Sequence, residues 1–449
     1  MNKRILIISM CLIGLVSAKE LKPTLPYYKL PIGKNLIYNS FSDFKGTNMS
    51  SSSKTQTQFW VYRKNPDSSY RIIVNQNISG YRMQDTIRKE SEPQIIWAYF
   101  DLFPDGKINH NVSLDNFDPF AYFIPLPTDT IIARNGWERF DSSSQEITHY
   151  IVENKNLIDH VWYIQINKQT PFDSVYLLST ISLVYLDLNQ GLMTTKEIKA
   201  TRGYGYATGK TVGLNTLDSV KPLDTVSLKP FINELISYFQ VESTYNQILD
   251  KVEYNSPDAN SLMAKAETIL NDAFDTANDS TVQALLNDDI TNHEQIKNSL
   301  SEDSLWFAKT IDKKAVEWKL KDLSEKTRTL KQYRGKVVIL DFWYRGCPWC
   351  IRAMPMINQI AEDFKDQPVV VFGMNVDKNK DDALFVTDKL KLIYPSLQAS
   401  GIDKQYEVTG FPTLFIIDKK GIIRDAHIGY SPDLGTKVTK KIESLLGKK

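Results

Sequence analysis

The chain has 449 residues, with 54 lysines and arginines against 53 aspartates and glutamates, 42% hydrophobic residues and 24% charged residues. This length predicts two to four domains, and the balanced charge disfavours binding to nucleic acid, which requires a clustered basic surface. The ordinary hydrophobicity also excludes a wholly disordered chain and a protein that crosses a membrane many times.

Residues 1–18 have the pattern of a secretory signal peptide. The basic pair Lys3-Arg4 precedes about a dozen apolar residues, and Val16-Ser17-Ala18 provides the small residues that signal peptidase prefers. An uncleaved membrane anchor is the alternative, but the apolar run is shorter than the roughly twenty residues that span a bilayer. Lipidation at Cys11 is disfavoured because Cys11 lies within the apolar run. The sequence therefore predicts an exported protein.

Residues 19–226 are predicted to form a β-rich domain of unknown function. Stretches rich in aromatic and β-branched residues recur between turn signals, among them Gln94–Phe103, Glu146–Glu153 and His160–Asn167. This spacing favours a large antiparallel sandwich or a curled half-barrel. The serine-rich segment Ser50–Lys54 is interpreted as a polar loop.

Residues 227–305 are predicted to be a helical connector. Apolar residues such as Leu235 and Phe239 recur at helical spacing, and Ser256-Pro257 has the form of an N-cap followed by a first-turn proline. The acidic segment Asn271–Glu302 lacks long apolar runs. It is interpreted as surface helices that join two domains.

Residues 314–449 have the alternating pattern of an α/β domain. Two continuous apolar runs are typical of strands buried on both faces, and a helical segment separates them. The pattern then ends in a hairpin and a helix. The elements expected in chain order are a strand at Val337–Leu340, a helix at Cys350–Phe364, a strand at Val369–Phe372, a hairpin over 414–428 and a helix at Leu434–Leu446. The whole chain is thus predicted to combine an antiparallel β domain, a helical connector and a C-terminal α/β domain.

The motif Cys347-Pro348-Trp349-Cys350 lies between a buried strand and a helix. Unpaired backbone N–H groups and the helix dipole stabilise an anion there and lower the pKa of the first thiol, so Cys347 is the expected nucleophile. Cys350 lies one helical turn away and is the expected resolving thiol, close enough to form a disulfide.

Two other interpretations of this pair are weaker. A zinc site needs four ligands, and the histidines show no ligand spacing; they are His110, His149, His160, His293 and His427. A purely structural disulfide that closes so short a loop would constrain the chain little.

The segment Val337–Pro355 resembles the active-site strand and helix of thioredoxin-fold proteins. Residues 314–449 resemble the exported TlpA/ResA-type thiol-disulfide oxidoreductases. The further matching segments are Gly335-Lys336, Asn375-Val376-Asp377, the helical stretch Asp381–Leu392, Val408–Thr413 and Gly429. The resemblance covers only the C-terminal third of the chain.

The resemblance implies a set of residues that contact the substrate. Pro412 stands at the place of the family's cis-proline, and the backbone of Phe411 before it is expected to pair with an extended client segment. Pro348 and Trp349 lie on the rim that the substrate touches. Trp349 replaces a proline that is usual in the family, and Gly346 replaces a usual tryptophan.

Asp341 stands where thioredoxins carry a buried carboxylate. Burial disfavours its charge, so it is expected to be protonated near neutral pH and to exchange a proton with Cys350. A hydrogen-bonded structural carboxylate is the alternative, and it gains weight because Gly373 stands where thioredoxins place a lysine.

The resulting functional prediction is a periplasmic enzyme without a cofactor that reduces disulfides in client proteins and is recharged by a membrane thiol electron donor. A disulfide oxidase or isomerase is one alternative, and an envelope protein that binds a ligand or partner through its N-terminal domain is another. A peroxidase is disfavoured because Leu340 and Tyr344 stand where peroxiredoxins need proline and threonine or serine.

Overall fold

The computed structural model covers most of the chain from residue 27 to residue 447. The residues described are 27–46, 49–84, 86–109, 117–127, 136–141, 146–152, 161–169, 175, 178–187, 192–203, 208–252 and 258–447. The predicted signal peptide and the predicted Ser256-Pro257 cap lie outside these residues.

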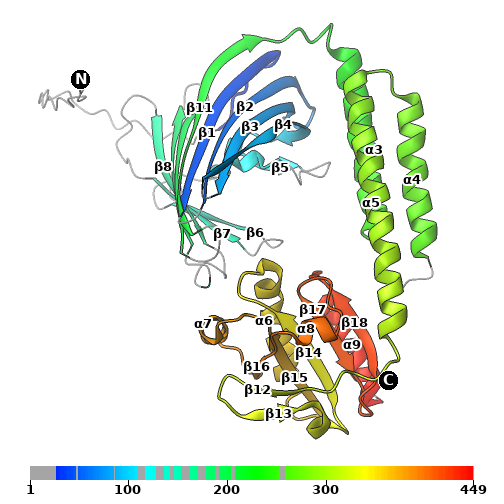
Figure 1. Ribbon diagram of the computed structural model, residues 1–449. Coiled ribbons are helices and arrows are strands. Elements are labelled where there is room, and N and C mark those ends of the chain that lie inside the picture. Colours follow the sequence, from blue (N-terminus) through cyan, green and yellow to red (C-terminus); the bar gives the residue numbers. More distant parts are fainter. Residues whose placement is uncertain are drawn as a thin grey trace, which may run out of the picture.

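The N-terminal part forms one curved antiparallel sheet of eleven strands (Figure 1). The strands are ordered β5-β4-β3-β2-β1-β11-β10-β9-β8-β7-β6. Their bounds are β1 Lys34–Gly46, β2 Met49–Lys64, β3 Tyr70–Gln84, β4 Ile87–Leu102, β5 Ile108–Asn109, β6 Trp137–Asp141, β7 Glu146–Val152, β8 Val161–Gln169, β9 Ser179–Asp187, β10 Leu192–Arg202 and β11 Gly209–Pro222. Of the two arrangements left open by the sequence, the curled single sheet is the one observed.

Alternating side chains give this sheet two apolar faces. On β2, Phe59 packs on one face against Phe123 of the loop that follows the short helix η1 (Pro119–Ala121). Its neighbour Trp60 points to the opposite face and contacts Phe231 of the first helix. The two-residue period of a strand produces this division.

The interpretation of Ser50–Lys54 as a loop is wrong. These residues belong to β2 and pair on one side with β1, where Ser50 lies opposite Lys45, and on the other with β3, where Ser53 lies opposite Gly80. The backbone N–H and C=O groups here are hydrogen-bonded to two neighbouring strands, so the segment is a strand although its side chains are not buried. The hydrophobic pattern therefore gave no signal for this half of the strand.

A group of three helices packs, through its first helix, against the second face of the sheet at β2 to β4, and it leads toward the C-terminal domain (Figure 1). They are α3 Lys229–Leu249, α4 Ala259–Thr276 and α5 Ser280–Thr310. On α3, Leu235 and Phe239 pack in the cluster that contains Ile73 and Tyr99 of the sheet. The helix α5 begins at its N-cap Asp279, whose side chain accepts a hydrogen bond from the backbone N–H of Thr281 (2.8 Å).

The end of α5 is built into the core of the C-terminal domain. Trp306 is buried, its ring lies 5.7 Å from the ring of Phe415, and its Nε1–H donates to the carbonyl oxygen of Glu407 (2.7 Å). The helix thus runs past residue 305, where the sequence placed the end of the connector, and anchors the connector to the C-terminal sheet.

We expect Trp306→Ala to lower the free energy of unfolding of the C-terminal domain by about 3 to 5 kcal/mol, because it removes a large buried ring and one hydrogen bond. Urea titration with fluorescence detection measures this loss. Leu305→Ala is the matched control, since Leu305 is exposed on the same turn and should change the midpoint little. Equal unfolding curves for the two variants would contradict the anchoring role of Trp306.

The C-terminal domain has a five-stranded sheet in the order β16-β15-β14-β17-β18. Its elements are the hairpin β12 Lys319–Lys321 and β13 Thr327–Thr329, the short helix η2 Leu330–Tyr333, then β14 Val337–Trp343, α6 Pro348–Asp363, β15 Val369–Asn375, α7 Lys380–Lys389, β16 Ser396–Gln398, α8 Ile402–Gln405, β17 Thr413–Ile417, β18 Ile423–Ile428 and α9 Leu434–Leu446. The predicted α/β class is confirmed. The central strand β14 is buried along its whole length. None of the helices in the described ranges is long and apolar enough to cross a membrane.

Candidate active site

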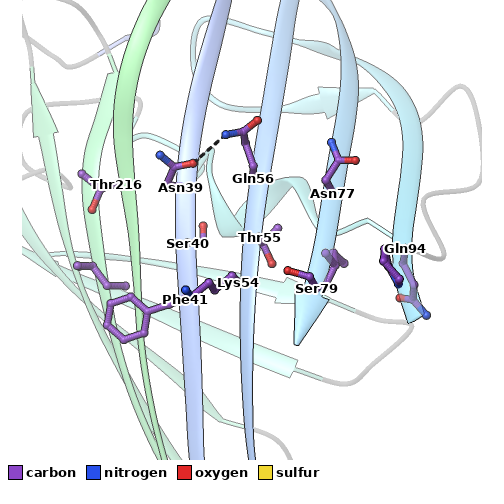
Figure 2. Close-up of a pocket in the computed structure, with 13 residues that line it drawn as sticks. Asn39, Ser40, Phe41, Lys54, Thr55, Gln56, Asn77, Ser79, Gln94 and Thr216 are labelled. Atoms are coloured by element: carbon purple, nitrogen blue, oxygen red, sulfur yellow. Dashed lines mark hydrogen bonds between the residues drawn. The ribbon is translucent and has the colours of Figure 1, made fainter. Parts of the chain in front are cut away.

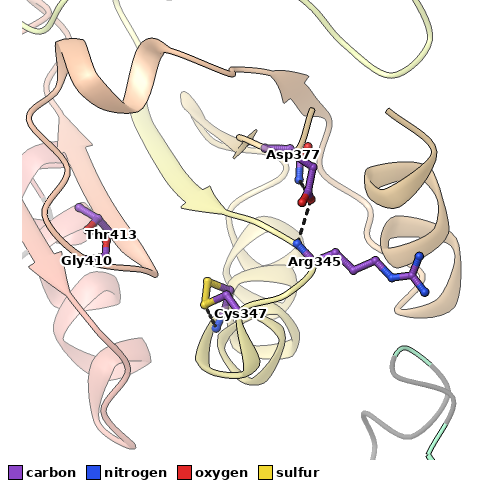
Figure 3. The surroundings of a disulfide bond; sticks show 7 residues. Arg345, Cys347, Asp377, Gly410 and Thr413 are labelled. Carbon is purple, nitrogen blue, oxygen red and sulfur yellow. Dashed lines mark hydrogen bonds between the residues drawn. A yellow bond between two sulfur atoms is a disulfide. The ribbon is translucent and has the colours of Figure 1, made fainter. Parts of the chain in front are cut away.

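Cys347 and Cys350 form a disulfide at the N-terminus of α6 (Figure 3). Cys347 is the N-cap residue in an extended conformation, and its Sγ accepts a hydrogen bond from the backbone N–H of Cys350 (3.1 Å). Pro348 occupies the first helical turn, where its missing N–H costs nothing. The helix therefore presents backbone donors to the sulfur of Cys347, which favours the anionic thiolate after reduction.

The turn between β14 and α6 is held by Arg345 and Asp377 (Figure 3). The backbone N–H of Arg345 donates to Asp377 Oδ2 (2.9 Å), and Asn375 Nδ2 donates to the same oxygen (2.8 Å). Burial raises the pKa of Asp377, although these hydrogen bonds oppose the rise. The guanidinium of Arg345 pairs with Asp382 at the start of α7 (2.9 Å). These contacts fix the position of the disulfide relative to β15 and α7.

Val175 brings the N-terminal part of the chain to the disulfide. Its carbonyl oxygen accepts a hydrogen bond from Arg345 Nη2 (3.2 Å), and its side chain lies in the apolar cluster with Trp343 and both cysteines. Cys347 and Cys350 are only 3% and 1% exposed. Sequence reasoning missed this contact, because no local pattern links residues so far apart.

The loop before β17 also lies beside the cysteine pair. The Phe411–Pro412 peptide bond is cis, and Phe411 packs against the cysteine cluster. Thr413 Oγ1 donates to the carbonyl oxygen of Gly410 (2.7 Å), and Gly429 N–H donates to that of Pro412 (2.7 Å), which fixes the loop at both ends (Figure 3). The structure thus brings Phe411 and the cysteines together.

Aromatic side chains form an exposed rim beside the disulfide. Trp349 is 53% exposed and stacks on Tyr430, with ring centroids 6.0 Å apart. The guanidinium of Arg352 lies 5.2 Å from the Trp349 ring. A cavity of about 590 Å³ adjoins this rim and is lined by Tyr430 and by residues of the connector, including Asp250 and Phe307.

Asp341 lies on the face of β14 that α6 covers and is 1% exposed. Burial raises the pKa of its carboxyl to about 7, although a hydrogen bond donated by the Tyr394 hydroxyl to Oδ2 (3.5 Å) lowers it. A group with this pKa exists in both protonation states near neutral pH. Tyr394 was not singled out from the sequence.

A separate cavity of about 580 Å³ lies on the N-terminal sheet (Figure 2). Most of the residues that line it are of polar types, among them Asn39, whose Oδ1 accepts a hydrogen bond from Gln56 Nε2 (3.2 Å). Its lining residues lie between 39 and 216 and do not include Val175, so it shares none with the disulfide site. Within the described ranges, no group of three or more His, Cys, Asp and Glu side chains is placed to hold a metal ion.

Comparison with known proteins places the similarity in the C-terminal domain. Residues 311–426 match the AhpC/TSA family. The chain is 32% identical over 118 residues to the thioredoxin-like protein YneN of Bacillus subtilis (strain 168), which covers 26% of this chain and 69% of YneN. It is 32% identical over 128 residues to the thiol-disulfide oxidoreductase ResA of Geobacillus kaustophilus (strain HTA426), covering 27% and 71%. A solved structure, a putative thiol:disulfide interchange protein DsbE from Chlorobium tepidum, is 27% identical, covers 31% of this chain and 100% of that chain, and has a TM-score of 0.30.

Proposed function

The chain belongs, through its C-terminal domain, to the thioredoxin-like thiol-disulfide oxidoreductases, and on this premise we propose that it reduces disulfide bonds of client proteins in the periplasm. The observation that carries the proposal is the Cys347–Cys350 disulfide at the N-terminus of α6, with the Phe411 loop beside it. Export through a cleaved signal peptide at residues 1–18 is part of the proposal.

The reaction starts from the reduced pair. The thiolate of Cys347 attacks one sulfur of the client disulfide, which forms a mixed disulfide and releases the other client sulfur as a thiolate. The thiol of Cys350 then loses its proton to the carboxylate of Asp341 and attacks the sulfur of Cys347. This step forms the Cys347–Cys350 disulfide, releases the second client thiolate and leaves Asp341 protonated.

The disulfide observed in the structure is the product of this cycle. Its reduction requires two electrons from a dithiol, and we propose a membrane thiol electron donor as their source. The attack of the donor on the disulfide regenerates the two thiols. Asp341 releases its proton before the next turnover.

The surface around the disulfide supports a role in holding an extended client segment. The backbone of Phe411 pairs with this segment as an added strand would, and Pro412 and Pro348 flank the reacting sulfurs. Trp349, which stacks on the half-buried Tyr430, offers exposed aromatic surface next to them. A cavity lined by Tyr430 adjoins this aromatic surface.

We expect Trp349→Ala to raise the KM for a protein disulfide about tenfold while it changes kcat little. The loss reflects the exposed aromatic surface that Trp349 offers to the client, whose burial is worth about 1 to 2 kcal/mol. Steady-state kinetics of insulin reduction measures KM and kcat separately. Phe140→Ala removes another exposed aromatic ring, on β6, and should leave both constants unchanged. An unchanged KM in Trp349→Ala would remove Trp349 from the client surface.

A disulfide oxidase or isomerase is the second candidate, favoured by Trp349 in the slot where relatives carry proline. The intervening dipeptide tunes the redox potential of a Cys-x-x-Cys pair. Equilibration of the protein with glutathione buffers distinguishes the two functions: a potential near about −270 mV suits a reductant, and one near about −120 mV suits a donor of disulfides. The proposed reductase requires the lower value.

A further inference from the structure

Arg352 lies on α6 two residues after Cys350 and one helical turn after Trp349. Residues three apart on a helix are neighbours on its surface, so the side chains of Trp349 and Arg352 share one face. The guanidinium carbon of Arg352 lies 5.2 Å from the centre of the Trp349 ring and 5.8 Å from that of Tyr430, and the two rings are stacked. Cation–π contacts thus hold Arg352 at the aromatic rim of the redox site.

Arg352 differs from the other arginines of the C-terminal domain in its charge partners. Residues 314–447 contain five arginines, and four of them form ion pairs with carboxylates. The pairs are Arg328 with Asp322, Arg334 with Glu317, Arg345 with Asp382 and Arg424 with Asp418. The guanidinium of Arg352 forms no ion pair or hydrogen bond with any residue that the structure describes. The arginine beside the disulfide is therefore the one whose charge the domain leaves unpaired within the described ranges.

The residues around Arg352 explain why its charge is unpaired. The positions three and four residues away on α6 are all uncharged; they are Pro348, Trp349, Pro355 and Met356. The loop after β18, which carries Tyr430, contains one acidic residue, Asp433. Its carboxylate is already bound by Ser431 Oγ (2.7 Å) and Lys437 Nζ (2.9 Å). The donors of Arg352 are thus available to a group from outside the chain.

A carboxylate is the group that fits this arrangement. A guanidinium stays protonated and presents a planar fork of N–H donors that matches the two oxygens of a carboxylate. The two rings restrict the side chain before any partner arrives, which lowers the entropic cost of pairing. Trp349 lies between the two cysteines in the sequence, so a client that presents its cystine to Cys347 places its neighbouring residues close to this rim.

We propose that Arg352 binds the carboxylate of an aspartate or glutamate that lies close to the cystine of a client protein. Segments with an acidic residue beside the cystine are then the preferred clients. This inference rests on the proposed function and names the chemistry of the clients that the site selects. Arg352 is a specificity-determining residue in this account, and it takes no part in the exchange of sulfur bonds.

The test compares kcat/KM for peptides that carry one disulfide and one variable residue, which is glutamate, glutamine or lysine at successive positions on either side of the cystine. The full-length wild type should reduce the glutamate peptide about fivefold faster than the glutamine peptide at one position or more, and the lysine peptide more slowly still. The preference should shrink as the salt concentration rises. Arg352→Gln should remove it, and Arg352→Glu should reverse it in favour of lysine.

Arg88→Gln is the matched control. Arg88 also lies over an aromatic ring, that of Tyr81, but on the N-terminal sheet, so its loss should leave the preference for glutamate unchanged. A wild type without preference at any position would overturn the inference, as would a preference that persists in Arg352→Gln. Equal slowing of all peptides by Arg352→Gln would also overturn it, because the charge would then act on the thiolate of Cys347 and not on the client.

The same peptides separate this inference from the proposed function. Their dithiol forms react with the oxidised protein, so exchange can be followed in the opposite direction as well. A preference for glutamate in that direction without any catalysed reduction would overturn the proposed function alone. Catalysed reduction without a preference would overturn the role of Arg352 alone.

Discussion

Cys347→Ser is expected to reduce insulin disulfides no faster than the uncatalysed reaction with dithiothreitol. Serine cannot form the mixed disulfide, and no other thiol of the motif lies at the N-cap position of α6. Turbidity of the reduced insulin chains measures the rate. Turnover equal to that of the wild type would contradict the assignment of Cys347 as nucleophile.

The control for this variant is the wild-type protein reduced with dithiothreitol, which also lacks the disulfide. The disulfide closes a very short loop and is worth only about 2 kcal/mol, so both proteins should be folded. Equal unfolding midpoints for the two show that the loss of activity is chemical.

Asp341→Asn is expected to raise the free energy of unfolding by about 4 kcal/mol above pH 7. The pKa of this carboxyl is about 7 in the folded protein against an ordinary value of 3.8. Near pH 4 the folded carboxyl is protonated and the unfolded one is only about half ionised, so the wild type and the variant should still be nearly equally stable. As the pH rises to 7, the unfolded chain ionises while the folded one does not, and the wild type loses stability.

Denaturant unfolding at pH 4, 6 and 8 measures this divergence. Asp322→Asn is the matched control with the opposite sign. Burial alone would raise the pKa of Asp322, but hydrogen bonds from Ser324 and Arg328 overcome it and lower the pKa, so neutralisation of Asp322 should destabilise the protein at pH 8. A constant difference between Asp341→Asn and the wild type across this range would contradict a carboxyl that titrates near neutrality.

Asp341→Asn also tests the proton acceptor in turnover. The variant should slow the release of the client from the mixed disulfide and lose the pH dependence of this step near 7, because asparagine accepts no proton. Stopped-flow measurement of client release against pH gives both values. If Asp341→Asn keeps the pH profile of the wild type, Asp341 is a structural carboxylate, which is the alternative that the sequence left open.

The C-terminal domain was predictable because its signals are local. The continuous apolar run of β14 indicates a strand buried on both faces, and the helix predicted at Leu434–Leu446 is confirmed with the same bounds. The hairpin β12–β13 and the three-residue strand β16 escaped prediction, since such short strands carry little periodicity. The N-terminal sheet was harder because its strands extend beyond the apolar core, as at Ser50–Lys54.

The candidate site was only partly visible in the sequence. The spacing of Cys347 and Cys350 and the strand position of Asp341 pointed to redox chemistry. Tyr394 did not, because only tertiary packing brings its hydroxyl to Asp341.

The most direct test of the account is the trapping of a mixed disulfide by Cys350→Ser. The reduced variant should attack a client disulfide and then stall, because no resolving thiol remains. Peptide mapping by mass spectrometry should find the client cysteine linked to Cys347. The absence of any adduct, or an adduct at Cys350 in the Cys347→Ser variant at the same rate, would contradict the claim that Cys347 exchanges disulfides with client proteins.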